Sequence, residues 1–371
     1  GLQMQLLREG NGTTLEATNK ITIGEKAFYN SAINKVTIKS PTIEIASYAF
    51  NNTKLKSFEI SDTETVISIG YLAIANNLDL TSLKITTTVS IEHLDYGFAS
   101  YNPRLSLIEL VDPSKKYNSS NGVVYFGTTL LVYPAGKVGS TYTAVNGEYI
   151  LTTQDPGDMQ DNFGIYYTFD GENYTQLTSS ANWVDNTYYT RAVKNIAPHA
   201  FAGNTHIRNL ILDSGNAVVK KDATSFVQNS QSLTFFVPAN LVNSYINDWA
   251  VNNVTYISVN LNGMVLKLLV SGRYAVEKYT GLDTDIVINS KIIDGDKVYN
   301  VVAIADNAFN QNISIRKVTL GAGIEKVGKY AFYNCTSLET FISGSMLTVI
   351  DTSAFQNCVN LKNIDLNEGL I

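Results

Sequence analysis

The sequence is poor in cysteine, histidine and basic residues, and each shortage argues against a class of protein. Two cysteines in 371 residues are too few for a disulfide framework. Three scattered histidines offer neither a metal cluster nor a nucleophile–histidine pair. The 27 Lys and Arg against 33 Asp and Glu leave a net charge of −6, whereas phosphate backbones require a basic patch. We therefore expect no nucleic-acid partner, no metal and no cofactor.

Long apolar runs are also missing. The longest candidate, 264–270, is only strand-sized and is interrupted by Lys267, so we expect no membrane insertion. Gly1 in place of an initiator Met suggests that a leader or tag was removed, and the chain stops partway into what reads as another repeat. We expect both ends to be boundaries set by processing or truncation.

What the sequence does contain is an Ala-Phe pair that recurs along the chain. Neighbouring copies lie 22 to 24 residues apart within each run, and a fixed period of this size is the signature of a stacked-repeat fold. Its clear copies and variants are Ala27-Phe28, Ala49-Phe50, Ala73-Ile74, Gly97-Phe98, Ala200-Phe201, Ser225-Phe226, Ala308-Phe309, Ala331-Phe332 and Ala354-Phe355.

Other positions move with the pair. Four residues before the alanine stands an aliphatic residue, with His93 as the exception. Three residues after it stands asparagine in five copies, where left-handed backbone geometry at the end of a turn costs little. A short alternating run such as Val36-Thr37-Ile38 follows, which predicts a half-buried strand. The pair itself is expected on a short helix or turn, with Phe filling the interior between coils.

These positions resemble the BspA-like subfamily of leucine-rich repeats, whose unit reads Leu-x-x-Ile-x-Leu, a turn, then Ile-Gly-x-x-Ala-Phe-x-x-Cys-x-x-Leu. The unit is matched at 23–28 and at 327–335. The resemblance implies an α/β repeat solenoid of BspA-type leucine-rich repeats with a parallel concave β-sheet, here interrupted by β-rich insertions. It also implies a surface or secreted protein of an anaerobic bacterium.

We divide the chain into four parts by where the repeat stops and resumes. Residues 1–111 form an N-terminal cap and repeats, and 112–195 form a hairpin with a turn at Gly127-Thr128-Thr129 and a tyrosine-rich β insertion. Residues 196–260 carry resumed repeats and a short helix entered through Pro238, and 261–371 carry hairpins with turns at Asn262-Gly263 and Asp294-Gly295 and the C-terminal repeats. Within the insertion, we expect Tyr166-Tyr167-Thr168 and Tyr188-Tyr189-Thr190 to be paired strands around an Asp170-Gly171 turn.

The few groups that could carry chemistry all have plain structural interpretations. Cys335 and Cys358 occupy the same column of adjacent repeats, and we expect buried free thiols, with a disulfide as the alternative. His93 is expected to be hydrogen-bonded and partly buried, and His199 to be exposed. The acidic residues of the insertion do not match a calcium loop, so we expect a solvated loop, with a weak calcium site as the alternative. They are Asp155, Asp158, Asp161, Asp170 and Glu172.

The remaining candidate site is a group of aromatic residues in the insertion, which suits glycan or protein contacts or else packs a small core of its own. Its members are Tyr166, Tyr167, Tyr174, Trp183, Tyr188 and Tyr189. We predict a monomeric, non-catalytic, secreted or cell-surface adhesion protein that presents a solenoid surface to proteins or glycans on host or bacterial surfaces. The alternative is a glycan-binding or scaffold module of a larger surface protein, with specificity in 138–193.

Overall fold

The computed structural model describes residues 5–7, 13–61, 64–114, 116–143, 193–213, 217–229, 232–270, 272–295 and 297–366, and four short strands between 148 and 189. For those four strands and for 5–7, 13 and 297 it is the backbone that is described. The chain divides into two compact units, Gly1–Phe235 (unit 1) and Phe236–Ile371 (unit 2).

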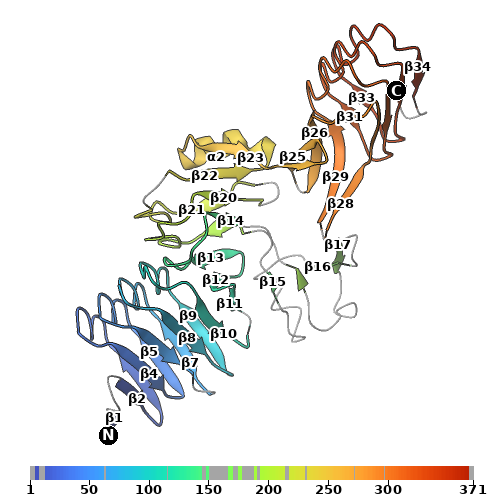
Figure 1. The fold of residues 1–371 in the computed structure, drawn as a ribbon. Coiled ribbons are helices and arrows are strands. Elements are labelled where there is room, and N and C mark those ends of the chain that lie inside the picture. The colour runs from blue at the N-terminus through green and yellow to red at the C-terminus, as the bar shows by residue number, and fades with distance from the viewer. Residues whose placement is uncertain are drawn as a thin grey trace. The chain divides into compact units, whose positions relative to one another are not determined.

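Unit 1 begins with coils that each add one strand to each of two sheets (Figure 1). The front sheet contains β1 (Gln5–Leu7), β2 (Thr13–Glu16), β4 (Lys35–Lys39), β6 (Ser57–Ile60), β8 (Ser82–Thr86) and β10 (Ile108–Val111). The side sheet contains β3 (Lys20–Ile23), β5 (Thr42–Ile45), β7 (Val66–Ile69) and β9 (Ser90–Leu94). All pairs are parallel except the antiparallel β1–β2, and in β4 to β7 every second residue is buried, which confirms the predicted alternation.

The second part of unit 1 starts with the predicted hairpin insertion. It has three strands, β11 (Tyr117–Ser120), β12 (Val123–Phe126) and β13 (Thr129–Val132), and the predicted turn at Gly127 joins the last two. The strands β19 (Asn195–Ile196) and β21 (Lys220–Lys221) then extend this sheet in parallel from β13. Strand β14 (Thr141–Thr143) pairs in parallel with β20 (Asn209–Ile211), so the solenoid resumes after the interruption.

Unit 2 opens after β22 (Thr234–Val237), which lies at the boundary between the units, with η2 (Ala239–Leu241), α2 (Val242–Trp249) and β23 (Val254–Tyr256). One sheet contains β24 (Ser258–Leu261), β25 (Met264–Val270), β26 (Arg273–Tyr279), β28 (Lys291–Asp294), β29 (Lys297–Ile304), β31 (Lys326–Val327) and β33 (Val349–Ile350). The other contains β27 (Asp285–Ile288), β30 (Lys317–Leu320), β32 (Thr340–Ile342) and β34 (Asn363–Asp365). The predicted hairpin turns at Asn262-Gly263 and Asp294-Gly295 and the helix after Pro238 are confirmed.

The expected α/β character is not what the structure shows, because the Ala-Phe segments are turns. In the first coil, Lys26 and Asn30 on either side of the pair have positive φ values of 56° and 58°, which interrupts any helix. The backbone N–H groups of the turn then alternate between acceptors in their own coil and acceptors in the next coil. The Ala27 N–H donates to Gly24 within the coil (3.2 Å), whereas the Phe28 N–H donates to Ala49 of the next coil (2.8 Å). A helix would keep these bonds inside one coil, so the turn is what allows neighbouring coils to be tied together. The α-helix of the described residues is α2.

The phenylalanine column runs through the interior as a stack of rings. Phe28 stacks on Phe50 with ring centroids 4.9 Å apart, and Phe332 lies between Phe309 (4.8 Å) and Phe355 (5.2 Å). Burying each ring contributes about 1.5–3 kcal/mol to stability.

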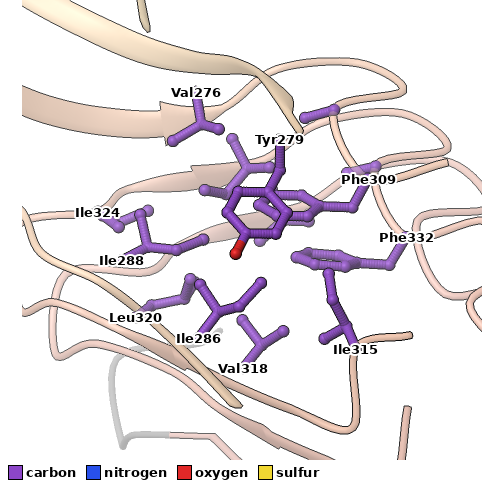
Figure 2. Close-up of a cluster of buried hydrophobic side chains, with 14 of the residues drawn as sticks. Val276, Tyr279, Ile286, Ile288, Phe309, Ile315, Val318, Leu320, Ile324 and Phe332 are labelled. Atoms are coloured by element: carbon purple, nitrogen blue, oxygen red, sulfur yellow. The ribbon is translucent and has the colours of Figure 1, made fainter. Parts of the chain in front are cut away.

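Two tyrosines that the repeat pattern did not reveal also belong to this column. Tyr279 stacks on Phe309 at 5.6 Å, as Figure 2 shows, and its N–H donates to Ala308 as a column residue should. Tyr133 stacks on Phe201 at 4.9 Å, and its N–H donates to Ala200. Each therefore marks a coil that lacks the Ala-Phe pair.

The prediction for His93 was wrong, because the fourth coil is displaced by one residue. Strand β9 contains a bulge, so Ser68 pairs with His93 and Ile69 pairs with Leu94. Leu94 therefore takes the buried aliphatic position and the His93 side chain is 59% exposed. In the same coil Phe98 takes the alanine position, since its carbonyl accepts the Ile74 N–H (2.7 Å).

Candidate functional site

Five of the six predicted aromatic residues lie on two β-ribbons of the insertion. Tyr166 and Tyr167 are on β16 (Tyr166–Phe169), which pairs with β17 (Tyr174–Leu177), so the hairpin partner of β16 is not the expected Tyr188-Tyr189 segment. That segment, β18 (Tyr188–Tyr189), pairs instead with β15 (Glu148–Tyr149).

Twofold alternation along each strand explains the wrong pairing, because both tyrosine pairs carry the same strand signal and the register between them is set by contacts far apart in sequence. Trp183 and the acidic residues Asp155, Asp158, Asp161, Asp170 and Glu172 lie outside the described residues. The aromatic site and the calcium alternative therefore stay predictions.

Cys335 and Cys358 are free thiols that perform the same structural task in adjacent coils. The Cys335 thiol donates to the Phe309 carbonyl and the Cys358 thiol donates to the Phe332 carbonyl, both at 3.0 Å. The neighbouring Cys358, together with burial, raises the pKa of Cys335, which favours the thiol over the thiolate. The prediction of buried free thiols is confirmed for Cys335, while Cys358 is only partly buried.

The prediction that His199 is exposed was wrong, because its ring is half-buried between tyrosines of other coils. Its Nε2 hydrogen-bonds to the Tyr71 hydroxyl (2.7 Å) and its Nδ1 to the Tyr101 hydroxyl (2.8 Å). Tyr48 extends the group, since its ring makes an edge contact with Tyr71 at 5.6 Å. We call Tyr48, Tyr71, Tyr101 and His199 the turn-edge cluster. All four belong to unit 1.

Backbone geometry brings the turn-edge cluster together across the interruption of the repeat. The Tyr101 N–H donates to the Ala202 carbonyl (3.3 Å) and the Ser100 hydroxyl donates to the His199 carbonyl (2.8 Å), so these two turns stack although they are about 100 residues apart. Gly97 permits this approach, since it has a φ of 64° and a Cβ there would lie 3.0 Å from the His199 Cβ. The sequence did not predict this cluster, because about 100 residues separate the two turns. The only signal in the sequence was the presence of tyrosines at neighbouring turn positions.

The pKa values of the titrating groups are shifted in the directions that keep the cluster neutral near pH 7. Burial lowers the pKa of His199, and the nearby Asp222 carboxylate only partly opposes this. Burial, aided by Tyr48 and Asp95, raises the pKa of Tyr71, and burial with Tyr71 raises the pKa of Tyr101. The cluster therefore offers neutral hydrogen-bonding groups and carries no buried charge.

The front sheet of unit 1 presents a second regular surface. Strand register places Thr37, Glu59, Lys84 and Glu109 in one outward row, and the Lys84 ammonium lies 3.4 Å from the Glu109 carboxylate. Exposed pairs of this kind contribute about 0–1 kcal/mol, so the row constrains the fold little and is free to vary.

The described residues contain neither a metal-binding group of side chains nor a helix that could span a membrane. They hold no group of three or more His, Cys, Asp or Glu side chains that could bind a metal ion. None of their helices has the length and apolar character that crossing a membrane requires.

Comparison with known proteins identifies the family. Residues 16–120 and 289–371 match the BspA type leucine rich repeat region in six copies, over about half of the chain. The chain belongs to the BspA-type leucine-rich repeat family. A comparison with curated proteins finds no match.

Several solved structures are similar to this chain. A leucine-rich repeat protein from Bacteroides capillosus is 23% identical over 30% of this chain and 84% of that one, with a TM-score of 0.29. The pneumococcal vaccine antigen PcpA is 12% identical over 99% and 87%, with a TM-score of 0.31. A leucine rich cell surface protein from Faecalibacterium prausnitzii is 15% identical over 98% and 92%, with a TM-score of 0.26.

Proposed function

We propose that this chain is a non-catalytic, secreted or cell-surface binding protein that presents solenoid surfaces to macromolecules on host or bacterial cells. The observation that carries the proposal is the outward row of the front sheet, where each coil places one side chain in register with the next. Such a row offers many weak contacts at fixed spacing, which suits recognition of an extended partner. Membership of a family of repeat proteins, whose members are often binding modules, supports the same function.

A second candidate is a glycan-binding or scaffold module whose specificity resides in 138–193. It is favoured by the pairing of the insertion strands. Strands β15 to β18 pair only among themselves in the described residues, so they form ribbons distinct from the solenoid sheets. A ribbon that is not needed to complete a coil is free to carry recognition.

Replacing one segment of the chain distinguishes the two candidate functions. Because β14 ends at Thr143 and completes a solenoid sheet, 144–192 should be replaced by a short Gly-Ser linker while 138–143 and Val193 are kept. Both proteins would be immobilised and screened against extracellular-matrix proteins and oligosaccharides. Binding that survives the replacement assigns recognition to the solenoid, and binding lost at unchanged melting temperature assigns it to the insertion.

A matched control tests the front sheet itself. Lys84→Glu reverses the charge at the centre of the outward row and should change the free energy of unfolding by less than about 1 kcal/mol. If the row carries recognition, this variant loses affinity while its melting temperature holds. Failure of the unaltered chain to bind any member of the panel would contradict both candidates.

A further inference from the structure

We propose that the turn-edge cluster of Tyr48, Tyr71, Tyr101 and His199 is a binding site for a neutral oligosaccharide. The proposal rests on the function proposed above, since it names one ligand class for one face of the solenoid. It depends on three properties of the cluster: the arrangement of its rings, the direction of its hydrogen bonds and the charges beside it.

The rings form a continuous strip along the turns of unit 1. Tyr71 contacts Tyr48 at 5.6 Å with an interplanar angle of 84°, and it contacts His199 at 5.6 Å and 60°. Tyr101 contacts the other side of His199 at 5.7 Å. All four side chains are partly exposed. Rings with an apolar body and a polar tip match a sugar, which has an apolar C–H face and a rim of hydroxyl groups.

The hydrogen-bonded chain through the cluster leaves one donor and one acceptor for a ligand. It runs from the Tyr71 hydroxyl through the His199 imidazole to the Tyr101 hydroxyl. A neutral imidazole donates at one nitrogen and accepts at the other, so the chain has a single direction. Whichever direction it takes, the hydroxyl at one end keeps a free O–H and the hydroxyl at the other keeps free lone pairs. An oligosaccharide carries several hydroxyl groups along its length, and each of them can donate or accept a hydrogen bond.

Nearby charges favour a neutral sugar over an acidic one. The Asp95 carboxylate acts on Tyr71 and the Asp222 carboxylate acts on His199 through their charges, so both lie near the cluster. Carboxylates accept hydrogen bonds from sugar hydroxyls and repel sialic acid or sulfate groups. The Lys26 ammonium lies over the Tyr48 ring at 5.6 Å, but it is already paired with the Glu25 carboxylate at 3.5 Å.

The site is also held in place before a ligand arrives. Bonds between the turns of Tyr101 and His199 anchor the backbone on both sides, and the His199 imidazole fixes the Tyr71 and Tyr101 hydroxyls. Groups ordered in advance lose little conformational entropy on binding, which raises affinity for a ligand of few contacts.

The experiment uses the full chain and a printed array of neutral, sialylated and sulfated oligosaccharides, followed by titration calorimetry with maltotriose, mannotriose, lactose and sialyllactose. We expect binding to at least one neutral member and weaker binding to its sialylated counterpart. Tyr71→Ala should weaken the affinity about tenfold or more, and Tyr71→Phe, which keeps the ring and breaks the chain of hydrogen bonds, should weaken it less.

The control removes a tyrosine from a similar turn in the other unit. Tyr330 also contacts a second tyrosine, Tyr333, at 5.4 Å, but Tyr330→Ala should leave sugar affinity unchanged. Preference for acidic sugars, no binding to any neutral sugar, or neutral binding that Tyr71→Ala leaves intact at native melting temperature would overturn the proposal. Loss of sugar binding alone, with a matrix protein still bound, would overturn this site and leave the broader function standing.

Discussion

Buried polar side chains at one repeat position hold the coils in register. The residue four places after the alanine position donates to the carbonyl of the phenylalanine column in the preceding coil, whether it is Asn77 (to Phe50, 3.1 Å), Asn102 (to Ile74, 2.8 Å) or Cys335 (to Phe309, 3.0 Å). An amide and a thiol thus perform one task, because both place a donor at the same short distance from the backbone.

Asn102→Ala tests this role. Asn102 is fully buried, donates to Ile74 and Ala99, and accepts the Asn77 N–H, so its loss leaves three buried groups without a partner. We expect the free energy of unfolding to fall by about 2–4 kcal/mol, measured by urea denaturation. Asn19→Ala, at an exposed position, is the control and should change it by less than about 0.5 kcal/mol. Equal effects of the two changes would show that burial of this amide is unimportant.

His199 makes stability depend on pH. Burial lowers its pKa below the unperturbed 6.5, so the folded chain binds fewer protons than the unfolded chain just below that pH. The stabilising contribution is therefore complete above about pH 6.5 and is lost as the pH falls through the unfolded pKa toward the depressed folded one. The melting temperature of the unaltered chain should drop between about pH 7 and pH 5.5. His199→Gln keeps a donor and an acceptor but does not titrate, so its melting temperature should drop less. Parallel curves would contradict this assignment.

At the scale of the turn, two left-handed residues replace a helix. The asparagines three places after the alanine were predicted to be left-handed, and Asn30, Asn52, Asn76, Asn334 and Asn357 all have φ between 56° and 64°. The second left-handed position, just before the alanine, was not predictable, since Lys26, Tyr48 and His199 occupy it. Lysine and tyrosine do not signal positive φ. The contacts between coils impose the conformation.

Substitutions at Asn334 should reveal this conformation. Asn334 has a φ of 57°, so Asn334→Ala should cost about 1 kcal/mol from the left-handed strain of an alanine. Asn334→Gly removes that strain and should come closer to the native melting temperature, even though both variants lose the hydrogen bond from Asn357 (2.8 Å). Calorimetry that ranks alanine above glycine would contradict the turn geometry.

The phenylalanine column sets the stability of each stack. Phe332 is fully buried between two rings, so Phe332→Ala should destabilise unit 2 by about 3–5 kcal/mol. Phe355→Ala removes a half-buried ring of the last described coil and should cost less. Chemical denaturation followed by hydrogen exchange over 260–366 measures both changes. A larger loss at Phe355 than at Phe332 would be incompatible with the stack.

At the scale of the whole molecule, the repeats and the places where they stop were readable from sequence, but the strand pairing within the 138–193 insertion was not. The Ala-Phe period predicted the solenoid and the family, because each copy repeats one packing problem, and glycine-containing turn sequences predicted the hairpin turns. Tyr133 and Tyr279 were not predicted as column residues because their coils lack the alanine. The contacts of His199 were not predicted because its partners belong to coils about 100 residues away in sequence. The features that were not predicted depend on long-range register, which a local sequence pattern does not encode.

A similar division distinguishes the residues that build the fold from those that we propose bind a partner. The repeating aliphatic and phenylalanine positions are buried in the inner coils, whereas the front-sheet row and the turn-edge cluster are composed of residues that differ from coil to coil. The central claim is that columns build the fold and non-repeating surface residues bind.

The most direct test measures affinity and melting temperature together for two variants, using the tightest ligand of the screen. The column variant Phe332→Leu should lower the melting temperature and leave the dissociation constant unchanged. A surface variant at the responsible face, Tyr71→Ala or Lys84→Glu, should raise the dissociation constant about tenfold at a nearly unchanged melting temperature. Affinity lost with the column variant and kept with both surface variants would contradict the claim.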